Sequence, residues 1–325
     1  MKRDGIGPLP QDVTARRQAL LERRKRQEAK LERLRAKRRG QHWSQQYLRF
    51  AITVGLKLLG LYGRGRRNAD HPLLRTESLF FKDLPAAFDG FRILHLGDFH
   101  FDGRPGFAEA IRDLLDPLEV DLCVFTGDSI FEYYLPDDVA VEGLRMVLDG
   151  VHARYGVVGC LGNNDYLRYI APMAEIGVRW LINENVRLER EGESLYVAGV
   201  DDPHRFRCAD VVAALDGVPQ DAFVVLLSHA PEGLEEAAAR GVRLCLSGHT
   251  HGGQLCLPWI GAVYKNGKCA WNQVHGLWRV NGMVGNTTAG LGCTAVPVRF
   301  NCPSEAVLLE LHRGSEGPSK NRVRR

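Results

Sequence analysis

The chain has 325 residues, 45% of them hydrophobic and 25% charged, which excludes a chain without a core and allows one large core or two smaller ones. The net charge of +4 conceals a split, because residues 1–67 hold 19 Lys and Arg against 5 Asp and Glu, and residues 313–325 hold 5 against 1. The remaining body therefore carries about −14, and its basic ends suit an anionic surface, either lipid or nucleic acid, or are simply solvated.

The cysteines favour a reduced compartment. None of the eight forms a Cys-x-x-Cys pair, and Cys123, Cys160 and Cys245 lie inside apolar runs, where a thiol behaves as a small hydrophobic group. This pattern argues against the disulfide framework of a small secreted protein. The first 45 residues are highly charged and lack the apolar segment of a secretory signal, so we expect a cytoplasmic location.

Residues 1–46 are predicted to form a basic arm that is helical or disordered. The part from Gln11 to Arg39 is rich in Arg, Lys, Glu, Leu and Ala and contains no Gly or Pro, which favours a helix. Its apolar residues are too sparse to form a stripe that faces a core. We therefore expect a solvated helix or a basic arm.

Residues 47–70 are predicted to form an amphipathic helix and a linker. From Tyr47 to Tyr62, polar residues recur every three or four positions in a narrow stripe, and leucines and other apolar residues cover the rest. Sixteen helical residues span roughly 24 Å, less than the ~30 Å hydrocarbon core, so we expect a helix in the membrane interface. A helix packed on the body and a true span are the alternatives. Residues 63–70 read as the linker, and residues 47–67 as the contact with an anionic membrane.

The body, residues 71–312, alternates strand-like and helical patterns, which indicates an α/β fold with two sheets packed face to face and helices outside. The tail, residues 313–325, is predicted to be basic and disordered. The expected strands are Ser78–Phe81, Phe91–Leu96, Val120–Thr126, Gly156–Leu161, Leu195–Val200, Phe223–Ser228, Leu244–Ser247, Gly282–Asn286 and Ala306–Leu311. The expected helices are Gly106–Leu115, Asp138–Leu148, Leu167–Ile176, Ala209–Leu215 and Glu232–Ala239.

Five of the apolar runs end in residues that bind metal ions. These residues are Asp98, His100, Asp128, Asn163, His229, His249 and His251. Because sites in open α/β sheets form outside the carboxyl ends of strands, the five ends are expected to converge. The seven side chains offer oxygen and nitrogen donors without a thiolate, which suits two divalent ions of the manganese, iron or zinc kind.

Four of the seven candidates also have a structural alternative. Asp98, Asp128 and Asn163 are good turn residues beside glycine, and His229 suits a position near a helix start. In the Gly-His-Thr-His segment, the two histidines would point to the same side if the backbone were a regular strand. The occurrence of all these residues after five successive apolar runs favours a metal site.

The motifs Asp-x-His, Gly-Asp, Gly-Asn-x-Asp, His and Gly-His-x-His, in this order, resemble the calcineurin-like metallophosphoesterase family over residues 76–311. Residues 161–166, 247–254 and 297–303 further resemble its membrane-associated bacterial branch, which includes peripheral phosphodiesterases and a UDP-2,3-diacylglucosamine hydrolase. The resemblance implies a four-layer αββα sandwich. It also implies two divalent ions, with manganese as first choice and iron or zinc as alternatives. One ion would lie on Asp98, His100 and His251, the other on Asn163, His229 and His249, and Asp128 would bridge both.

Asn164 departs from the family, in which the residue after the ligand asparagine is usually a histidine thought to protonate the leaving oxygen. Asparagine cannot act as an acid near pH 7, so it either weakens the enzyme or selects pyrophosphate-type substrates, whose leaving phosphate is already a stable anion. Asp165 is the second catalytic candidate, because it is placed to orient Asn164 or a ligand; capping a helix at Tyr166 is its alternative role. Weaker candidates are His204, Arg205, Arg207 and Asn286, whereas His95 reads as a core histidine.

Together these features predict a dinuclear metal-dependent hydrolase of phosphoric esters or anhydrides on the inner face of the bacterial inner membrane. Two ions acidify a shared water and neutralise phosphoryl charge. The preferred substrate is UDP-2,3-diacylglucosamine, a step of lipid A biosynthesis that yields UMP and the lipid 1-phosphate. A broad-specificity phosphodiesterase and an inactive metal-binding membrane scaffold are the alternatives. Nucleic acid is the weaker partner because the basic arm lacks an array of stacking aromatics, and the oligomeric state stays open.

Overall fold

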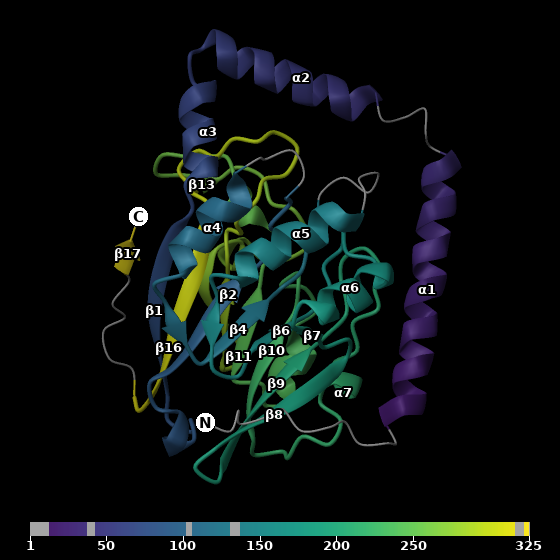
Figure 1. Cartoon of the computed structure of the whole chain (residues 1–325), viewed down its shortest axis with the longest axis vertical. Coiled ribbons are helices and arrows are strands. Elements are labelled where there is room, and N and C mark those ends of the chain that lie inside the picture. The colour runs from purple at the N-terminus through teal and green to yellow at the C-terminus, as the bar shows by residue number, and fades with distance from the viewer. Residues whose placement is uncertain (1–12, 38–42, 102–105, 131–136, 316–321, 325) are drawn as a thin grey trace.

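The computed structural model describes residues 13–37, 43–101, 106–130, 137–315 and 322–324. Two sheets form its centre (Figure 1). The first has the order β17-β1-β16-β2-β4-β6-β7, with β17 Arg322–Arg324, β1 Leu73–Phe81, β16 Glu305–Arg313, β2 Phe91–Leu96, β4 Leu122–Phe125, β6 Val157–Gly159 and β7 Val178–Trp180. The second has the order β14-β15-β11-β10-β9-β8, with β14 Gly276–Val280, β15 Met283–Thr287, β11 Leu244–Ser247, β10 Phe223–Leu227, β9 Glu193–Gly199 and β8 Glu184–Arg190.

Helices and short elements complete the described fold. The helices are α1 Val13–Lys37, α2 Trp43–Leu58, α3 Tyr62–Asp70, α4 Phe107–Leu115, α5 Asp137–Leu148, α6 Ile170–Glu175, α7 Val211–Ala214 and α8 Glu235–Ala239. Single 3₁₀ turns are η1 Ala86–Phe88, η2 Leu167–Tyr169, η3 His251–Gly253 and η4 Trp271–Gln273. Two small pairs are β3 Glu119–Val120 with β5 His152–Ala153, and β12 Cys256–Leu257 with β13 Gly261–Ala262.

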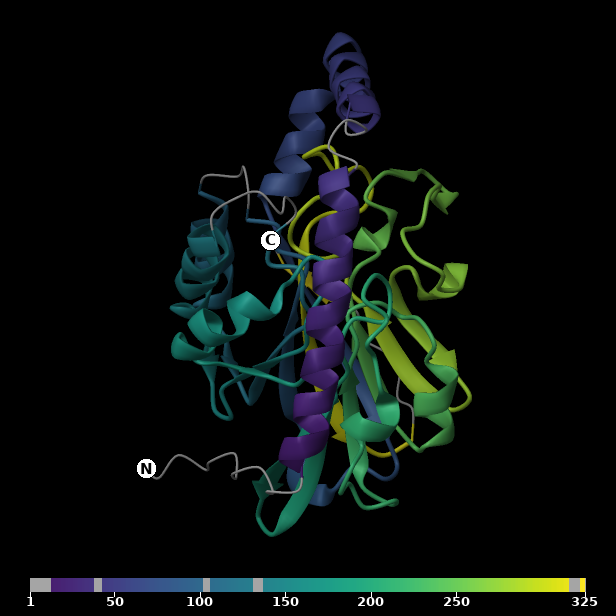
Figure 2. The same ribbon diagram turned by 90° about the vertical axis from the view of Figure 1, so that its right-hand side faces the viewer.

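The predicted four-layer sandwich is confirmed, because each sheet buries both of its faces. Along β2, Phe91 and Ile93 pack between the two sheets, whereas Leu94 and Leu96 pack toward α4 and α5. The second sheet packs its outer side chains against α7 and α8. In Figure 2, the teal helices lie to the left of the sheets and the green helices to the right. Burial on both faces explains why these strands read as continuous apolar runs.

Parallel pairing brings the carboxyl ends of the central strands to one edge. Strands β2, β4 and β6 run parallel in the first sheet, and β9, β10, β11 and β15 run parallel in the second. All the strands predicted from apolar runs are present; β2 and β11 have the predicted bounds, and the ends of the others are shifted. Strands β7, β8, β14 and β17 of the two sheets were not predicted.

The N-terminal arm differs from the prediction of a solvated helix. Helix α1 packs along the body, and Arg24 is fully buried there. Its guanidinium donates hydrogen bonds to Asp201 and to the carbonyl of Asp165, and it stacks over the Phe206 ring, with Cζ 3.4 Å from the ring centroid. The docking depends mainly on polar contacts, of which those of Arg24 are buried, and not on an apolar stripe, which is why hydrophobic periodicity gave no sign of it. Residues 1–12 and 38–42 lie outside the described residues.

Helix α2 projects from the body, as Figure 1 shows at the top of the molecule. None of its described side chains is buried, and Phe50 and Leu58 are 68% and 83% exposed. The helix therefore does not pack on the body, which was the alternative to a membrane-interface helix. In the described parts of the chain, no helix combines the length and the apolar character that crossing a bilayer requires.

Two predicted irregular segments are regular. The segment expected to be a linker forms helix α3. Gly65 lets this helix pack closely on Phe300, because a Cβ on Gly65 would lie 2.8 Å from the Phe300 ring. The C-terminal tail, predicted to be disordered, contributes β17, whose backbone pairs with β1 in antiparallel fashion. Backbone pairing at a sheet edge makes few demands on side chains, so the composition of the tail did not reveal it.

Candidate metal centre

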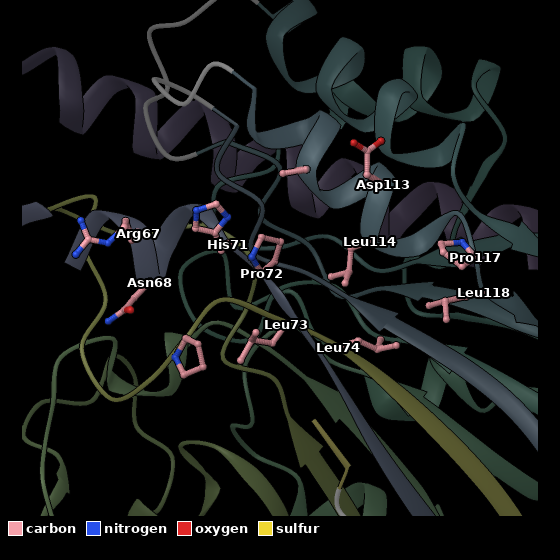
Figure 3. A pocket seen from close by; sticks show the side chains of 12 residues that line it. Arg67, Asn68, His71, Pro72, Leu73, Leu74, Asp113, Leu114, Pro117 and Leu118 are labelled. Carbon is pink, nitrogen blue, oxygen red and sulfur yellow. The ribbon is translucent and has the colours of Figure 1, made fainter. Parts of the chain in front are cut away.

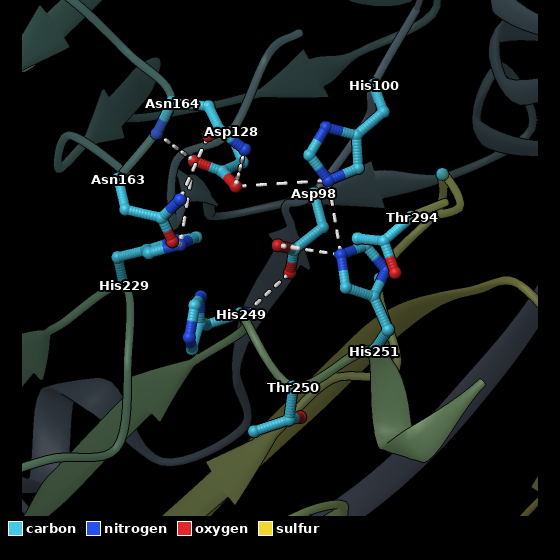
Figure 4. A network of polar contacts seen from close by, with 12 residues as sticks. Asp98, His100, Asp128, Asn163, Asn164, His229, His249, Thr250, His251 and Thr294 are labelled. Atoms are coloured by element: carbon cyan, nitrogen blue, oxygen red, sulfur yellow. Dashed lines mark hydrogen bonds and ion pairs between the residues drawn. The ribbon is translucent and has the colours of Figure 1, made fainter. Parts of the chain in front are cut away.

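The seven predicted ligands lie together where the carboxyl ends of the two sheets meet (Figure 4). The first sheet supplies Asp98 and His100 after β2, Asp128 after β4 and Asn163 after β6. The second supplies His229 after β10 and His249 and His251 after β11. All seven are buried, with at most 4% of any of them exposed.

The ligand loops have an unusual backbone. Five of the seven residues have a positive φ, namely Asp98, His100, Asp128, His249 and His251. Non-glycine residues adopt this conformation at a cost of about 1–3 kcal/mol, and such residues concentrate at functional sites. Because β11 ends at Ser247, the premise of a regular strand fails for the Gly-His-Thr-His segment: His251 stacks on the His100 ring, whereas His249 lies against His229.

Glycines let these loops approach one another. A Cβ on Gly162 would fall on the Asp128 carboxylate, and a Cβ on Gly248 would fall on the Asp98 carboxylate. A side chain at either position would push a carboxylate out of the centre. The glycines beside the ligands are therefore required by the geometry of the site.

One group of possible ligand atoms consists of Asp98, His100 and His251, which lie within 4.8 Å of one another. The Nε2 atoms of the two histidines are 3.1 Å apart, and His251 Nε2 is 3.6 Å from Asp98 Oδ1. This buried oxygen accepts no hydrogen bond from the described residues. A carboxylate oxygen and two imidazole nitrogens that converge in this way fit a divalent cation.

A second group surrounds Asp128. Its Oδ1 is 3.6 Å from His229 Nε2, which is 3.0 Å from the amide oxygen of Asn163. The other oxygen, Oδ2, is 3.8 Å from His100 Nε2 in the first group. Asp128 thus lies between the two groups, where a carboxylate can bridge two cations. The His249 ring lies 5.0 Å from the His229 ring, measured between centroids.

The electrostatics of the cluster also fit cations. Burial raises the pKa of both carboxyls, Asp98 and Asp128, and lowers the pKa of His100 and His251. Burial also acts to lower the pKa of His229, but Asp128 and Asp98 together raise it to about 9. Burial thus disfavours charge on these two carboxyls and on His100 and His251, whereas His229 gains a proton from its acidic neighbours; a divalent cation would favour ionised carboxylates and neutral imidazoles.

The two catalytic candidates support the carboxylate between the groups. Asn164 donates to Asp128 Oδ1 from its backbone N–H and to Oδ2 from its side chain, both at 2.7 Å. The Asp165 carboxylate accepts the backbone N–H groups of Asp128, Ser129 and Gly162. Asp165 caps no helix, since Tyr166 is the N-cap of η2, so its role is to join two ligand loops.

The weaker candidates take different places. His204 lies against His249, with ring centroids 4.3 Å apart, and its Nδ1 is 2.9 Å from Glu232. These three form a further cluster of possible ligand atoms within 4.8 Å.

Arg205 donates to the Asn163 carbonyl and to Asn164 Oδ1. Arg207, Asn286 and His95 are elsewhere: Arg207 offers its carbonyl to Arg23, Asn286 accepts from Arg75, and His95 is buried beside Thr126.

Sequence reasoning missed two arginines that hold the site. Arg24 of α1 binds the Asp165 carbonyl, as described above. Arg299 is fully buried and donates to carbonyls of Ala289, Gly292 and His251, and one guanidinium nitrogen lies 3.4 Å from His251 Nδ1. Arg299 belongs to the Pro-Val-Arg-Phe-Asn-Cys-Pro segment of the resemblance, which was the available signal. Arg24 had none.

A separate pocket of about 810 Å³ lies where α3 meets β1 and α4 (Figure 3). Its walls are Arg67, Asn68, His71, Pro72, Leu73, Leu74, Ala110, Asp113, Leu114, Pro117, Leu118 and Pro303. It contains none of the seven predicted ligands, so it is not the metal centre.

Comparisons with known proteins agree with this geometry. The model of the calcineurin-like phosphoesterase family matches residues 91–253, which include all seven predicted ligands. The uncharacterized metallophosphoesterases YkuE and YkoQ of Bacillus subtilis (strain 168) are 28% and 27% identical over 274 residues, covering 80% and 81% of this chain and 92% and 100% of those proteins. The transmembrane protein with metallophosphoesterase domain of Danio rerio is 28% identical over 284 residues, covering 80% of this chain and 61% of that protein.

Proposed function

The chain belongs to the calcineurin-like phosphoesterase family and is a phosphoesterase hydrolase, and on that premise we propose that it cleaves a lipid-linked phosphoric anhydride at a membrane surface. The first candidate substrate is UDP-2,3-diacylglucosamine, with UMP and the lipid 1-phosphate as products. The observation that supports the hydrolytic chemistry is the convergence of buried carboxylates and imidazoles. Among the described residues, the buried oxygen Asp98 Oδ1 in this cluster accepts no hydrogen bond.

Two divalent ions, when bound, would supply Lewis acidity toward the phosphoryl group and an acidified water. Asp98, His100 and His251 would hold one ion, and Asn163, His229 and His249 the other. Asp128 lies between these two groups of side chains and would contact both ions, and two hydrogen bonds from Asn164 fix both of its oxygens. Asp165 in turn fixes the backbones from which Asp128 and Asn163 extend. We propose manganese as the native metal, with iron or zinc as alternatives.

Asn164 supports an anhydride substrate. Its side chain is occupied by Asp128, Asn163 and Arg205, and an amide cannot give a proton to a leaving alkoxide near pH 7. A phosphate leaving group has a second pKa of about 6 and needs little protonation. A pyrophosphate therefore suits this site better than an alkyl diester.

The exposed helix α2 supports the proposal that the enzyme acts at a membrane surface. A projecting helix with exposed apolar side chains and basic residues suits an anionic lipid interface on the cytoplasmic side of a bacterial inner membrane. The relative from Danio rerio is named a transmembrane protein, which agrees with a membrane setting. A peripheral position would give the enzyme direct access to a lipid-linked substrate.

The test is a product assay on the full chain with Mn²⁺. The panel consists of UDP-2,3-diacylglucosamine, a UDP-sugar, a nucleotide diester and nitrophenyl phosphate. We expect UMP release from the UDP-lipid, and a loss of at least roughly a hundredfold in Asp128→Asn, because the carboxylate between the two groups of candidate ligands is removed. Asp113→Asn, an exposed carboxylate on α4, is the matched control.

Each other outcome has a defined meaning. Turnover of simple diesters without UMP release would reject the lipid substrate and support a broad phosphodiesterase. Binding of two Mn²⁺ per chain without any product from the panel would support a metal-binding scaffold.

The substitution Asn164→His tests the leaving-group argument. A histidine can protonate an alkoxide, so cleavage of an alkyl diester should rise by roughly tenfold or more, while UDP-lipid cleavage should gain little. The ratio of the two kcat/KM values is the measurement. An unchanged ratio would contradict the argument that Asn164 selects anhydrides.

A further inference from the structure

The hairpin of β12 and β13 exposes a group of large apolar side chains. The Trp259 side chain is fully exposed, and Ile260 is 72% exposed. This apolar tip consists of Leu257, Trp259, Ile260, Val263 and Tyr264. Single exposed apolar residues are common on soluble proteins, but five within eight positions mark an interaction surface.

In Figure 1, β13 lies toward the same end of the molecule as α2 and α3. The link between them is Phe300. Its ring packs on Gly65 of α3, and its backbone bridges to Leu255 and accepts the N–H of Cys256, where the hairpin begins. The hairpin and the two helices therefore belong to one continuous end of the protein.

The charge of this end is mainly positive. Residues 43–70 and 254–272 contain one acidic residue, Asp70, which pairs with Arg66, and seven Lys and Arg: Arg49, Lys57, Arg64, Arg66, Arg67, Lys265 and Lys268. The body as a whole is acidic, so the contrast is local. Exposed aromatic and aliphatic side chains bordered by cations complement an anionic lipid surface, in which Trp and Tyr occupy the headgroup region.

The chain that leaves the hairpin borders the metal centre. Gly267 lies so close to the site that a Cβ there would be 2.7 Å from Glu232 Oε1 and 3.3 Å from the His249 ring. The backbone N–H of Lys268 donates to the same Glu232 oxygen at 2.7 Å. A surface that holds the hairpin would thus lie next to the candidate ligands.

We propose that the apolar tip is a second membrane contact, which inserts into the interface of an anionic bilayer beside α2 and turns the metal centre toward the lipid. The proposal rests on the membrane setting of the proposed function and adds to it a defined surface outside the N-terminal region. Contacts from two different elements, α2 and the hairpin, would fix the orientation of the protein on a membrane, which one helix alone does not.

The test is sedimentation of the full chain with vesicles of phosphatidylcholine alone or with phosphatidylglycerol. Burial of a Trp side chain contributes enough that Trp259→Ser should lower partitioning onto the anionic vesicles by roughly tenfold. Trp259→Phe should retain most of the binding. Val212→Ser on α7, where the side chain is 40% exposed, is the matched control and should bind like the unmodified chain. Unchanged melting temperatures would show that all variants are folded.

Equal vesicle binding by Trp259→Ser and the unmodified chain would overturn the proposal. So would self-association or capture of a protein partner that depends on Trp259 without any effect on vesicles, because the tip would then be a protein interface. The product assay is independent of this result. Vesicle binding that depends on Trp259, without UMP release, would leave the membrane contact in place and reject the substrate, and the reverse result would reject only the contact.

Discussion

Helices α1 and α2 follow each other in the chain and are both basic, yet only one of them packs on the body. The helix that docks is the more polar α1, which buries Arg24, whereas the more apolar α2 leaves Phe50 and Leu58 exposed. Apolar character alone therefore does not decide which helix joins the fold. Polar contacts with matched partners, Arg24 foremost, hold α1 on the body, whereas none of the described side chains of α2 is buried.

The matched partners of Arg24 come from distant parts of the chain. Its guanidinium forms an ion pair with the buried Asp201, donates to Glu28 of its own helix and binds the carbonyl of Asp165. The Glu28 carboxylate also accepts the backbone N–H of Leu167. Helix α1 thus contacts the segment that carries the candidate ligand Asn163.

The substitution Arg24→Met tests the comparison most strongly. Removing one partner of a buried ion pair leaves Asp201 without its counter-charge, so we expect a loss of about 3 kcal/mol in the free energy of unfolding. Activity on the soluble diester should fall roughly tenfold, because support of the Asp165 segment is lost. Denaturant unfolding and initial rates are the measurements. Arg16→Ala, which removes an exposed pair with Asp216, should change stability by no more than about 0.5 kcal/mol.

Equal effects of the two arginine substitutions would contradict the view that the buried Arg24 contributes most to the docking of α1. A destabilised but fully active Arg24→Met variant would show that α1 supports the fold without supporting the site.

The next test is the pH dependence of the difference in stability between the unmodified chain and Arg24→Met. Burial raises the pKa of Asp201 from 3.8 to about 6, and Arg24 acts against this rise. A carboxyl whose pKa is raised in the folded chain lowers the free energy of unfolding as the pH rises above 3.8, the usual pKa of the carboxyl. Arg24 offsets part of this loss of stability. The stability gap between the unmodified chain and Arg24→Met should therefore widen from about pH 5 to about pH 7.5. Denaturant unfolding at several pH values measures the gap, and a constant gap would contradict the ion pair.

The smallest effect on stability is expected in α2. The double substitution of Phe50 and Leu58 by Ser should change the free energy of unfolding by no more than about 0.5 kcal/mol, since both side chains are exposed. It should still weaken binding to anionic vesicles. Leu84→Ala, at a buried position, is the contrast and should cost about 2–5 kcal/mol. Destabilisation by the α2 substitutions of the size expected for Leu84→Ala would show that α2 packs on the body.

The site was predictable from the sequence to the extent that its residues follow buried strands. Asp98 and His251 stand directly after apolar runs, and the topology of parallel strands brings such positions together. The layered fold followed from the same runs. The short strand β7 lacked a run of this kind, and β8 was missed although its buried and exposed residues alternate.

The supporting contacts were not predictable in this way. Arg24 is one of ten Lys and Arg residues in α1, and its partner Asp201 is 177 positions away. No periodicity distinguishes the buried cation from the solvated ones. Gly65 read as a linker residue, because its role in helix α3 depends on the distant Phe300 ring. Long-range polar pairs and close backbone approaches are properties of the folded chain and not of local pattern.

Arg299 gives the protein a mechanical connection between its outer end and its chemistry. Its backbone N–H binds the carbonyl of Gly65 in α3, its carbonyl accepts from Asn68, and its side chain binds His251. A displacement of α3 would therefore be transmitted to a candidate metal ligand through a single residue. If α3 lies near a bilayer, the thickness, curvature or lateral pressure of the lipid would change the position of His251 and with it the activity of the enzyme.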